Sequence, residues 1–185
     1  MNRVAGVDAD RPPAVPRITL HRWLRTESRR RARDSLVRAL VYLEPVSSSE
    51  FSTSRMVTDK KDRPLLLVAS RHGSSLIVRA FRSYRAGHEA VLFASIEGSQ
   101  ATIRDIGCFT ESGLSHGVGT ALLRLAEEIF RREGATRIMG HLSPADFDHR
   151  GRQVHFYLKN GYEVCLDGLE GTVRKWLDEA EPPSP

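Results

Sequence analysis

Two glycines, Gly117 and Gly119, stand two positions apart in the stretch S-H-G-V-G-T-A-L-L, which runs from Ser115 to Leu123. Glycine has no Cβ, so the backbone N–H groups around it can come close to a bulky anion. A helix that begins at this turn adds the positive end of its dipole. The spacing therefore suits a phosphate group. Glycines also serve in ordinary strand-to-helix turns, so turn chemistry alone is the alternative interpretation.

The residues on either side predict a strand and a helix that would position this turn. Ala101 to Phe109 (A-T-I-R-D-I-G-C-F) carries the β-branched and apolar residues typical of a half-buried strand. Gly117 to Glu133 repeats apolar residues every three or four positions, which predicts an amphipathic helix. Its charged residues, Glu127 and Glu128 among them, are expected on the solvated face.

Other nucleotide-binding motifs fit this stretch less well. The chain holds no G-x-x-x-x-G-K-[ST] sequence, and the third glycine of a dinucleotide fingerprint would fall on Leu122.

The helix is followed by Gly134, which is typical of a helix end, and by an apolar run from Thr136 to Leu142. The segment F-Y-L-K-N-G-Y then runs from Phe156 to Tyr162. The order of elements is thus strand, glycine turn, helix, strand and aromatic segment.

This order resembles the GCN5-related N-acetyltransferases, the GNAT superfamily, over about residues 99–177. In that family the turn usually reads [RQ]-x-x-G-x-[GA]; Gly117 and Gly119 match its glycines, whereas Leu114 stands at the basic or amide position. The resemblance implies a mixed-sheet α/β fold with acetyl-CoA as co-substrate. It places the pantetheine arm beside the backbone of Cys108 and Phe109. It places the pyrophosphate over His116, Gly117, Val118, Gly119, Thr120 and Ala121.

A second family signature, Y-x-x-x-G-[FY], is matched by Tyr157, Gly161 and Tyr162. In many GNAT proteins that tyrosine returns a proton to the departing thiolate, so the resemblance implies that Tyr157 is the catalytic acid. A buried core aromatic is the alternative for this residue. Asp105, on the expected cofactor strand, is the candidate base that draws a proton from the amine through water. Strand alternation fits a solvent-facing Asp105 side chain slightly better.

Arg150 stands where many GNAT proteins have an asparagine that contacts the pantetheine arm, seven residues before the tyrosine. Its longer cationic side chain indicates a different cofactor contact, such as one to a phosphate.

A nearby group of side chains includes potential metal ligands: His141, Asp146, Asp148 and His149. Their order matches no metal motif, and Asp146 suits a helix cap, so we expect no metal site.

The composition is that of a single globular domain. The chain has 185 residues, of which 40% are hydrophobic and 28% charged. No apolar stretch approaches the roughly 20 residues of a membrane span, and the N-terminus lacks the apolar region of a secretory signal. We therefore expect a cytoplasmic protein without membrane contacts. Cys108 and Cys165 are the only cysteines and are expected to be free thiols.

We divide the chain into four parts: residues 1–19, a flexible N-terminus; 20–63, a basic helix and a linker; 64–178, a GNAT-like domain; and 179–185, a flexible tail. The helix is expected from Leu20 to Leu43 and the linker from Pro45 to Asp62. Four strands of an antiparallel meander then precede the glycine turn. They are Leu65 to Ser70, Ser75 to Ser83, His88 to Ile96, and Ala101 to Phe109.

One part of this order departs from the family. GNAT proteins usually place two helices between the first and second strands, where they help to form the acceptor pocket. This chain has only a short H-G-S turn there, beginning at His72. Either the basic helix replaces the two helices, or the strand numbering is shifted by one element. Both options leave the acceptor pocket unassigned.

The sequence thus predicts an N-acetyltransferase that moves an acetyl group from acetyl-CoA directly to an amine acceptor of open identity. The alternative is a non-catalytic GNAT-fold binding module whose basic helix binds nucleic acid or a protein partner. Residues Met1 to Arg63 hold 14 Lys and Arg against 8 Asp and Glu. A solvated helix face explains these arginines more simply, because no aromatic ladder accompanies them. Many GNAT proteins dimerise, so a homodimer is also left open.

Overall fold

The structure is a computed structural model that describes residues 30–31, 34, 51–82, 89–109, 116–143 and 149–177. Arg30, Arg31 and Asp34 are helical and exposed. The remainder of the predicted basic helix lies outside the described residues, as do the predicted flexible N-terminus, the tail and Leu114. Among the described helices, none combines the length and apolar character needed to cross a bilayer.

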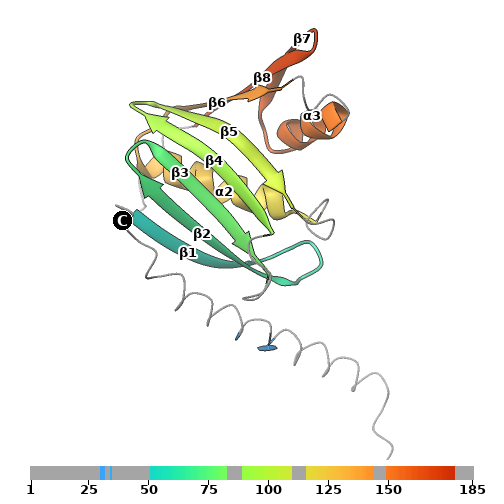
Figure 1. Cartoon of the computed structure of the whole chain (residues 1–185). Coiled ribbons are helices and arrows are strands. Elements are labelled where there is room, and N and C mark those ends of the chain that lie inside the picture. The colour runs from blue at the N-terminus through green and yellow to red at the C-terminus, as the bar shows by residue number, and fades with distance from the viewer. Residues whose placement is uncertain are drawn as a thin grey trace, which may run out of the picture.

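Eight strands form one sheet in the order β1-β2-β3-β4-β5-β6-β8-β7 (Figure 1). Every neighbouring pair is antiparallel except β5 and β6, which are parallel. The predicted meander is therefore confirmed. The strands are β1 (Phe51–Thr58), β2 (Pro64–His72), β3 (Ser75–Phe81), β4 (Ala90–Glu97), β5 (Gln100–Cys108), β6 (Arg137–Leu142), β7 (Glu163–Asp167) and β8 (Glu170–Trp176).

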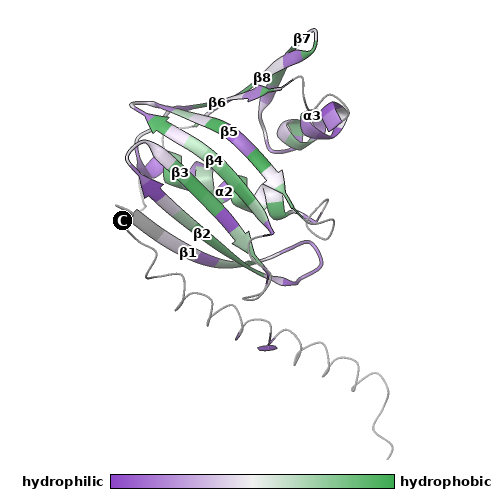
Figure 2. Ribbon diagram, in the orientation of Figure 1, coloured by the Kyte–Doolittle hydropathy of each residue, from purple (hydrophilic) through white to green (hydrophobic). Residues whose placement is uncertain are grey.

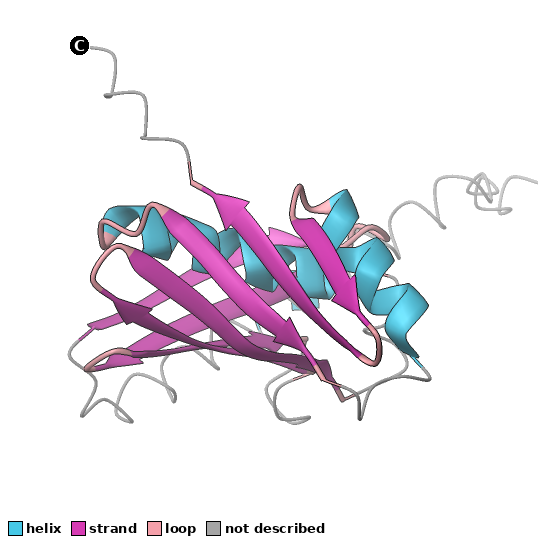
Figure 3. Cartoon of the chain, turned by 90° about the horizontal axis from the view of Figure 1, so that it is seen from above, coloured by secondary structure: helices cyan, strands magenta, loops and turns pink. Residues whose placement is uncertain are grey.

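Two described helices accompany the sheet, α2 (Val118–Arg132) and α3 (Arg150–Lys159). Helix α2 lies across one face of β2 to β5 (Figures 1 and 3), and it joins β5 to β6 as the crossover that a parallel pair requires. Its apolar side, with Leu122, Ile129 and Phe130 at most 1% exposed, packs on alternate apolar residues of the strands. Figure 2 shows the hydrophobic residues of the sheet in green. A second buried pair, Leu66 and Phe81, forms a separate small cluster.

Strand β1 corrects the prediction that Pro45 to Asp62 is a linker. Phe51 to Thr58 pairs with β2 along its whole length, from Phe51 opposite Arg71 to Thr58 opposite Pro64. The run F-S-T-S-R-M-V-T is rich in serine and threonine, which suggested a loop, but such residues are tolerated in a strand at the edge of a sheet. The sheet therefore begins one strand earlier than expected. The second strand, β2, still turns directly into β3 at Gly73, with no helix between them.

Glu127 corrects the expectation that every charged residue of α2 faces solvent. This residue is only 6% exposed, and its carboxylate accepts hydrogen bonds of 2.9 Å from the Tyr162 hydroxyl and from Lys175 Nζ. Lys175 Nζ also donates to the Asn160 carbonyl at 2.9 Å. Because buried charges are costly unless paired, this cluster fixes α2 to β8 and to the turn that follows α3.

Replacing Glu127 by alanine is expected to lower the free energy of unfolding by about 3 kcal/mol, because it leaves the Lys175 ammonium and the Tyr162 hydroxyl without their partner in a largely buried site. The neighbouring Glu128 offers the matched control. It pairs with Arg55 at 2.7 Å, but both side chains are more than two-fifths exposed. Glu128→Ala should cost less than about 1 kcal/mol. Urea denaturation of both variants tests this difference, and equal losses would contradict it.

Candidate functional site

Strands β5 and β6 separate part of the way along the sheet. Their parallel pairing covers only Gln100 to Ile103, opposite Arg137 to Gly140, whereas β5 continues to Cys108 beside β4. Beyond Ile103, none of the described strands pairs with β5 on its β6 side. Figure 1 shows this end of β5 diverging from the β7–β8 hairpin, with α3 on the same side of β5 as the hairpin. We call this divergence the fork, and the pair Ile103 and Gly140 its apex.

A β-bulge lies at the apex. Phe93 of β4 pairs with Asp105, and the next residue, Ala94, pairs with Ile103, so Arg104 is an extra residue in β5. Such a bulge bends and twists its strand, which explains why β5 leaves β6 at this point. Further along, the Phe109 N–H donates to the Glu89 carbonyl at 2.9 Å.

The alternation of an antiparallel ladder fixes which backbone groups of β5 face the fork. Because Phe109 and every second residue before it turn their polar groups toward β4, Ile106 and Cys108 turn theirs toward the unpaired side. An extended ligand with amide groups can hydrogen-bond to such a strand edge as an added strand would. The sequence prediction of cofactor contacts named Cys108 and Phe109 but missed Ile106, because a bulge leaves no clear mark in the residue pattern.

The first turn of α2 stands beside this strand edge. Gly117 precedes the helix with φ 87°, a conformation that favours glycine, and no side chain caps the helix start. The first internal bond runs from the Ala121 N–H to the Gly117 carbonyl at 3.0 Å, so the N–H groups of Val118, Gly119 and Thr120 have no partner within the helix. These donors and the helix dipole favour an anion at this place.

Gly119 has a second role that the sequence did not indicate. A Cβ at this position would lie 3.2 Å from the Phe156 ring of α3 and 3.9 Å from Ile106 Cδ1. The missing side chain therefore lets α3 pack closely against the start of α2, with β5 as the third wall. A substitution at Gly119 would disturb this packing as well as any bound ligand.

Lys60, in the turn between β1 and β2, brings a cationic side chain to the start of α2. Its N–H donates to the His116 carbonyl at 3.0 Å, and its Cγ lies 3.2 Å from the position that a Cβ on Gly117 would occupy. Within the described part of the chain, its ammonium forms no ion pair. Sequence analysis missed Lys60 because this segment was assigned to a linker, although a basic pair within D-K-K-D was visible.

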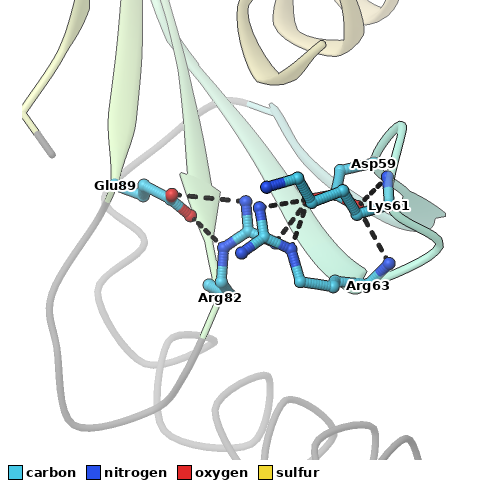
Figure 4. Close-up of polar contacts among 5 residues, drawn as sticks. All are labelled: Asp59, Lys61, Arg63, Arg82 and Glu89. Atoms are coloured by element: carbon cyan, nitrogen blue, oxygen red, sulfur yellow. Dashed lines mark hydrogen bonds and ion pairs between the residues drawn. The ribbon is translucent and has the colours of Figure 1, made fainter. Parts of the chain in front are cut away.

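Buried Asp59 holds the β1–β2 turn in shape (Figure 4). Its Oδ1 accepts from the Lys61 and Arg63 N–H groups at 2.8 and 2.9 Å, and its Oδ2 accepts from Arg63 Nε at 2.8 Å and Arg82 Nη1 at 2.9 Å. Arg82 also donates to the Glu89 carboxylate at 2.6 Å. The Glu89 carbonyl in turn accepts a hydrogen bond from the N–H of Phe109, the residue after β5. The network therefore connects the turn that carries Lys60 to the end of β5.

Tyr157 lies on the α3 wall of the fork. Its residue is 6% exposed, and its ring makes edge contacts with Phe156 and Tyr162 at centroid distances of 5.2 and 5.4 Å. Burial and the negative charge of Asp105 raise the pKa of Tyr157 to about 12. The phenol therefore keeps its proton at neutral pH. Tyr157 thus belongs to the core, as one interpretation of the sequence expected, and also lies within electrostatic reach of Asp105 across the fork.

The other predicted site residues are placed as follows. Asp105 is exposed. Burial, with a smaller effect of the Glu89 charge, raises the pKa of the Cys108 thiol, so this thiol stays protonated. The Arg150 guanidinium donates to the Gly168 carbonyl at 2.8 Å and to the Leu169 carbonyl, which attaches α3 to the β7–β8 turn.

The four potential metal ligands, at which we expected no metal site, are only partly described. His141 lies 3.9 Å from the Glu170 carboxylate, whereas Asp146 and Asp148 fall outside the described residues. The residues that are described contain no group of three potential metal-ligating side chains.

Comparison with known proteins identifies the fold. No family model matches the sequence. The uncharacterized protein YocC of Bacillus subtilis is 26% identical over 156 residues, which cover 73% of this chain and 92% of YocC. The GNAT domain of S. lividans PAT is 11% identical, with a TM-score of 0.56 over 67% of this chain and 97% of that domain.

A third similar protein is the PaiA N-acetyltransferase of Thermoplasma acidophilum, solved in complex with coenzyme A. It is 20% identical, with a TM-score of 0.49 over 56% of this chain and 62% of that protein. The predicted α/β fold with a GNAT-like mixed sheet is confirmed by the match to the S. lividans domain.

The pKa of Asp59 yields a prediction about acid stability. Burial alone would raise this pKa, but hydrogen bonds from Arg63, Lys61 and Arg82 outweigh it and lower the pKa from 3.8 to about 2. The folded protein therefore binds this proton less readily than the unfolded chain. The stabilisation, about 2 kcal/mol, is complete above about pH 5 and declines as the pH falls toward 2.

Urea denaturation between pH 7 and pH 2.5 measures this contribution, with Asp59→Asn as the comparison. The difference in free energy of unfolding between wild type and Asp59→Asn should shrink as the pH falls. A difference that stays constant over this range would show that the Asp59 charge contributes nothing.

Proposed function

We propose that this chain is an N-acyltransferase that uses acetyl-CoA as the acyl donor and an amine as the acceptor. The observation that carries the proposal is the fork, a strand edge with free amide groups that leads from the start of α2 to the apex. Its placement within a GNAT-like sheet supports this assignment. The cytoplasmic location remains a prediction from the sequence, and the homodimer remains the possibility that the sequence left open.

In the proposed complex, acetyl-CoA lies along β5. The pantetheine amides bond to the edge groups of Ile106 and Cys108, as an added strand would. The pyrophosphate lies at the N–H groups of Val118 to Thr120, where the helix dipole favours it. Lys60 contributes the cation that Leu114 does not supply. An arm that starts at α2 and follows β5 brings its thioester to the apex, beside Arg104 and the bulge.

The transfer proceeds in one step on the bound thioester. The neutral amine attacks the carbonyl carbon, a C–N bond forms, and the C–S bond breaks to release the CoA thiolate. The amine loses one proton, for which exposed Asp105 is the candidate acceptor through water, and the thiolate gains one. Tyr157 is the candidate donor of that proton. Its raised pKa of about 12 keeps the phenol protonated at neutral pH, so that it can donate a hydrogen bond to the departing thiolate. Because an ordinary thiol has a pKa of only about 8.5, the phenol gives up its proton to the thiolate only as another proton, such as the one released by the amine, replaces it.

The thiol of Cys108 is a poor candidate for an acyl-enzyme intermediate. Only the thiolate is a good nucleophile, and the raised pKa keeps the thiol protonated. Direct transfer therefore fits this site better than a covalent relay.

Replacing Lys60 by alanine tests where the phosphates bind. We expect isothermal titration calorimetry to show that the Kd for CoA rises about tenfold, the loss of one charge-assisted contact of about 1.4 kcal/mol. Lys61→Ala is the matched control, because it removes the adjacent charge from the same turn and should leave the Kd unchanged. Pantetheine, which has no pyrophosphate, should bind wild type and Lys60→Ala equally. Equal CoA affinity in both lysine variants would remove Lys60 from the site, and no CoA binding to the wild type would refute the proposed function.

A further inference from the structure

A groove of about 720 Å³ runs along β5, β6 and β8 and reaches the apex of the fork. Arg104, Arg137 and His141 line it, and all three are exposed. The neighbours of these residues in β6, Ile138 and Leu142, are buried in the core with α2. Because side chains alternate between the faces of a strand, the groove lies on the face of the sheet opposite α2.

The two arginines of the groove have no carboxylate partner among the described residues. The lining residues include two arginines and a histidine but no aspartate or glutamate. Arg104 donates only long hydrogen bonds of 3.3 and 3.4 Å to the neutral Ser95 hydroxyl. The Arg137 side chain makes no hydrogen bond or ion pair with another described residue. At the rim, His141 lies 3.9 Å from Glu170.

Most other arginines of the same sheet behave differently. Three of them are paired with a carboxylate: Arg55 with Glu128, Arg71 with Glu133, and Arg174 with Glu163. The exception among the described strands is Arg79 of β3, which donates a 3.5 Å hydrogen bond to the Ser70 hydroxyl and does not line the groove. A guanidinium offers a planar set of donors that suits carboxylate and phosphate oxygens. Within the groove, Arg104 and Arg137 therefore keep this capacity available to a ligand.

The position of the groove relates it to the proposed reaction. If acetyl-CoA reaches the apex along β5 from the α2 side, the acceptor amine must approach the same carbonyl from a space that the cofactor does not fill. The groove is such a space, because Ile103 and Gly140 of the apex belong to its lining. Arg104 follows the apex directly. Arg137 lies three residues away along β6, or about 10 Å at the usual rise per residue.

We propose that the acceptor is a small amine that also carries an anionic group, a carboxylate or a phosphate, bound by Arg104 and Arg137 in this groove. This inference rests on the proposed function and specifies its substrate class. With the acceptor amine at the apex, Arg104 would bind a carboxylate or phosphate close to the amine. Arg137 would bind a carboxylate or phosphate several bonds further away.

Matched pairs of acceptors test the charge requirement. Each pair compares an amino acid with its neutral carboxamide. The amino acids are β-alanine, 4-aminobutyrate and 6-aminohexanoate, which place the carboxylate at increasing distance from the amine. A further pair, 2-aminoethyl phosphate and ethanolamine, tests whether the groove prefers a phosphate to a carboxylate as the anionic group. Release of CoA thiol gives kcat/KM for each compound. We expect the anionic member of at least one pair to be preferred tenfold or more.

Three variants test the assigned residues. Arg104→Gln should reduce the preference for an acceptor whose acid is close to the amine about tenfold, and Arg137→Gln should do so for an acceptor whose acid is several bonds away. Both should leave the rate with the neutral partner nearly unchanged. Arg124→Gln is the matched control, because Arg124 is exposed on α2, on the other side of the sheet. It should keep the wild-type preference.

The outcomes separate this inference from the proposed function. If wild type binds CoA but treats charged and neutral amines alike, or transfers to no charged compound, the acceptor assignment is wrong and the cofactor assignment stands. A tenfold preference that survives in both arginine variants also overturns the assignment of the groove. If wild type binds no CoA in calorimetry, both the proposed function and the acceptor class fail.

Discussion

The parallel pairing of β5 and β6 stops after four residues, and the rest of the candidate site depends on that interruption. The bulge at Arg104 turns β5 away from β6, so that Ile106 and Cys108 present backbone groups that no strand takes up. Helix α2 starts beside the same edge because it is the crossover between these two strands. One local irregularity thus produces an extended edge for an amide-bearing ligand and places a helix start at its end.

Two buried charge clusters hold the elements around the fork. Asp59, Arg82 and Glu89 connect the β1–β2 turn to the end of β5, while Glu127 and Lys175 fix α2 to β8. A buried carboxylate is tolerated only where its partners are fixed, so each cluster specifies the relative position of segments far apart in the sequence. Both clusters join elements on either side of the fork and so fix the position of its walls.

The sequence was sufficient for the elements whose signal is local. The apolar period of residues 117–133 and the β-branched run of residues 101–109 predicted α2 and β5 correctly. Strand β1 was missed because its serine-rich residues are defined by pairing with β2 rather than by their own pattern. The burial of Glu127, the bulge at Arg104 and the approach of Lys60 to Gly117 all arise from contacts between distant segments. No periodicity within a single element reports such contacts.

The central claim is that an acyl-CoA binds along the free edge of β5, and amide hydrogen exchange resolved by NMR tests it most directly. With saturating CoA, the account predicts slower exchange for the amides of Ile106 and Cys108 and for those of Val118, Gly119 and Thr120, with little change at the paired residues of β2 and β3. Binding of CoA that leaves these five amides unchanged and protects a different surface would contradict it.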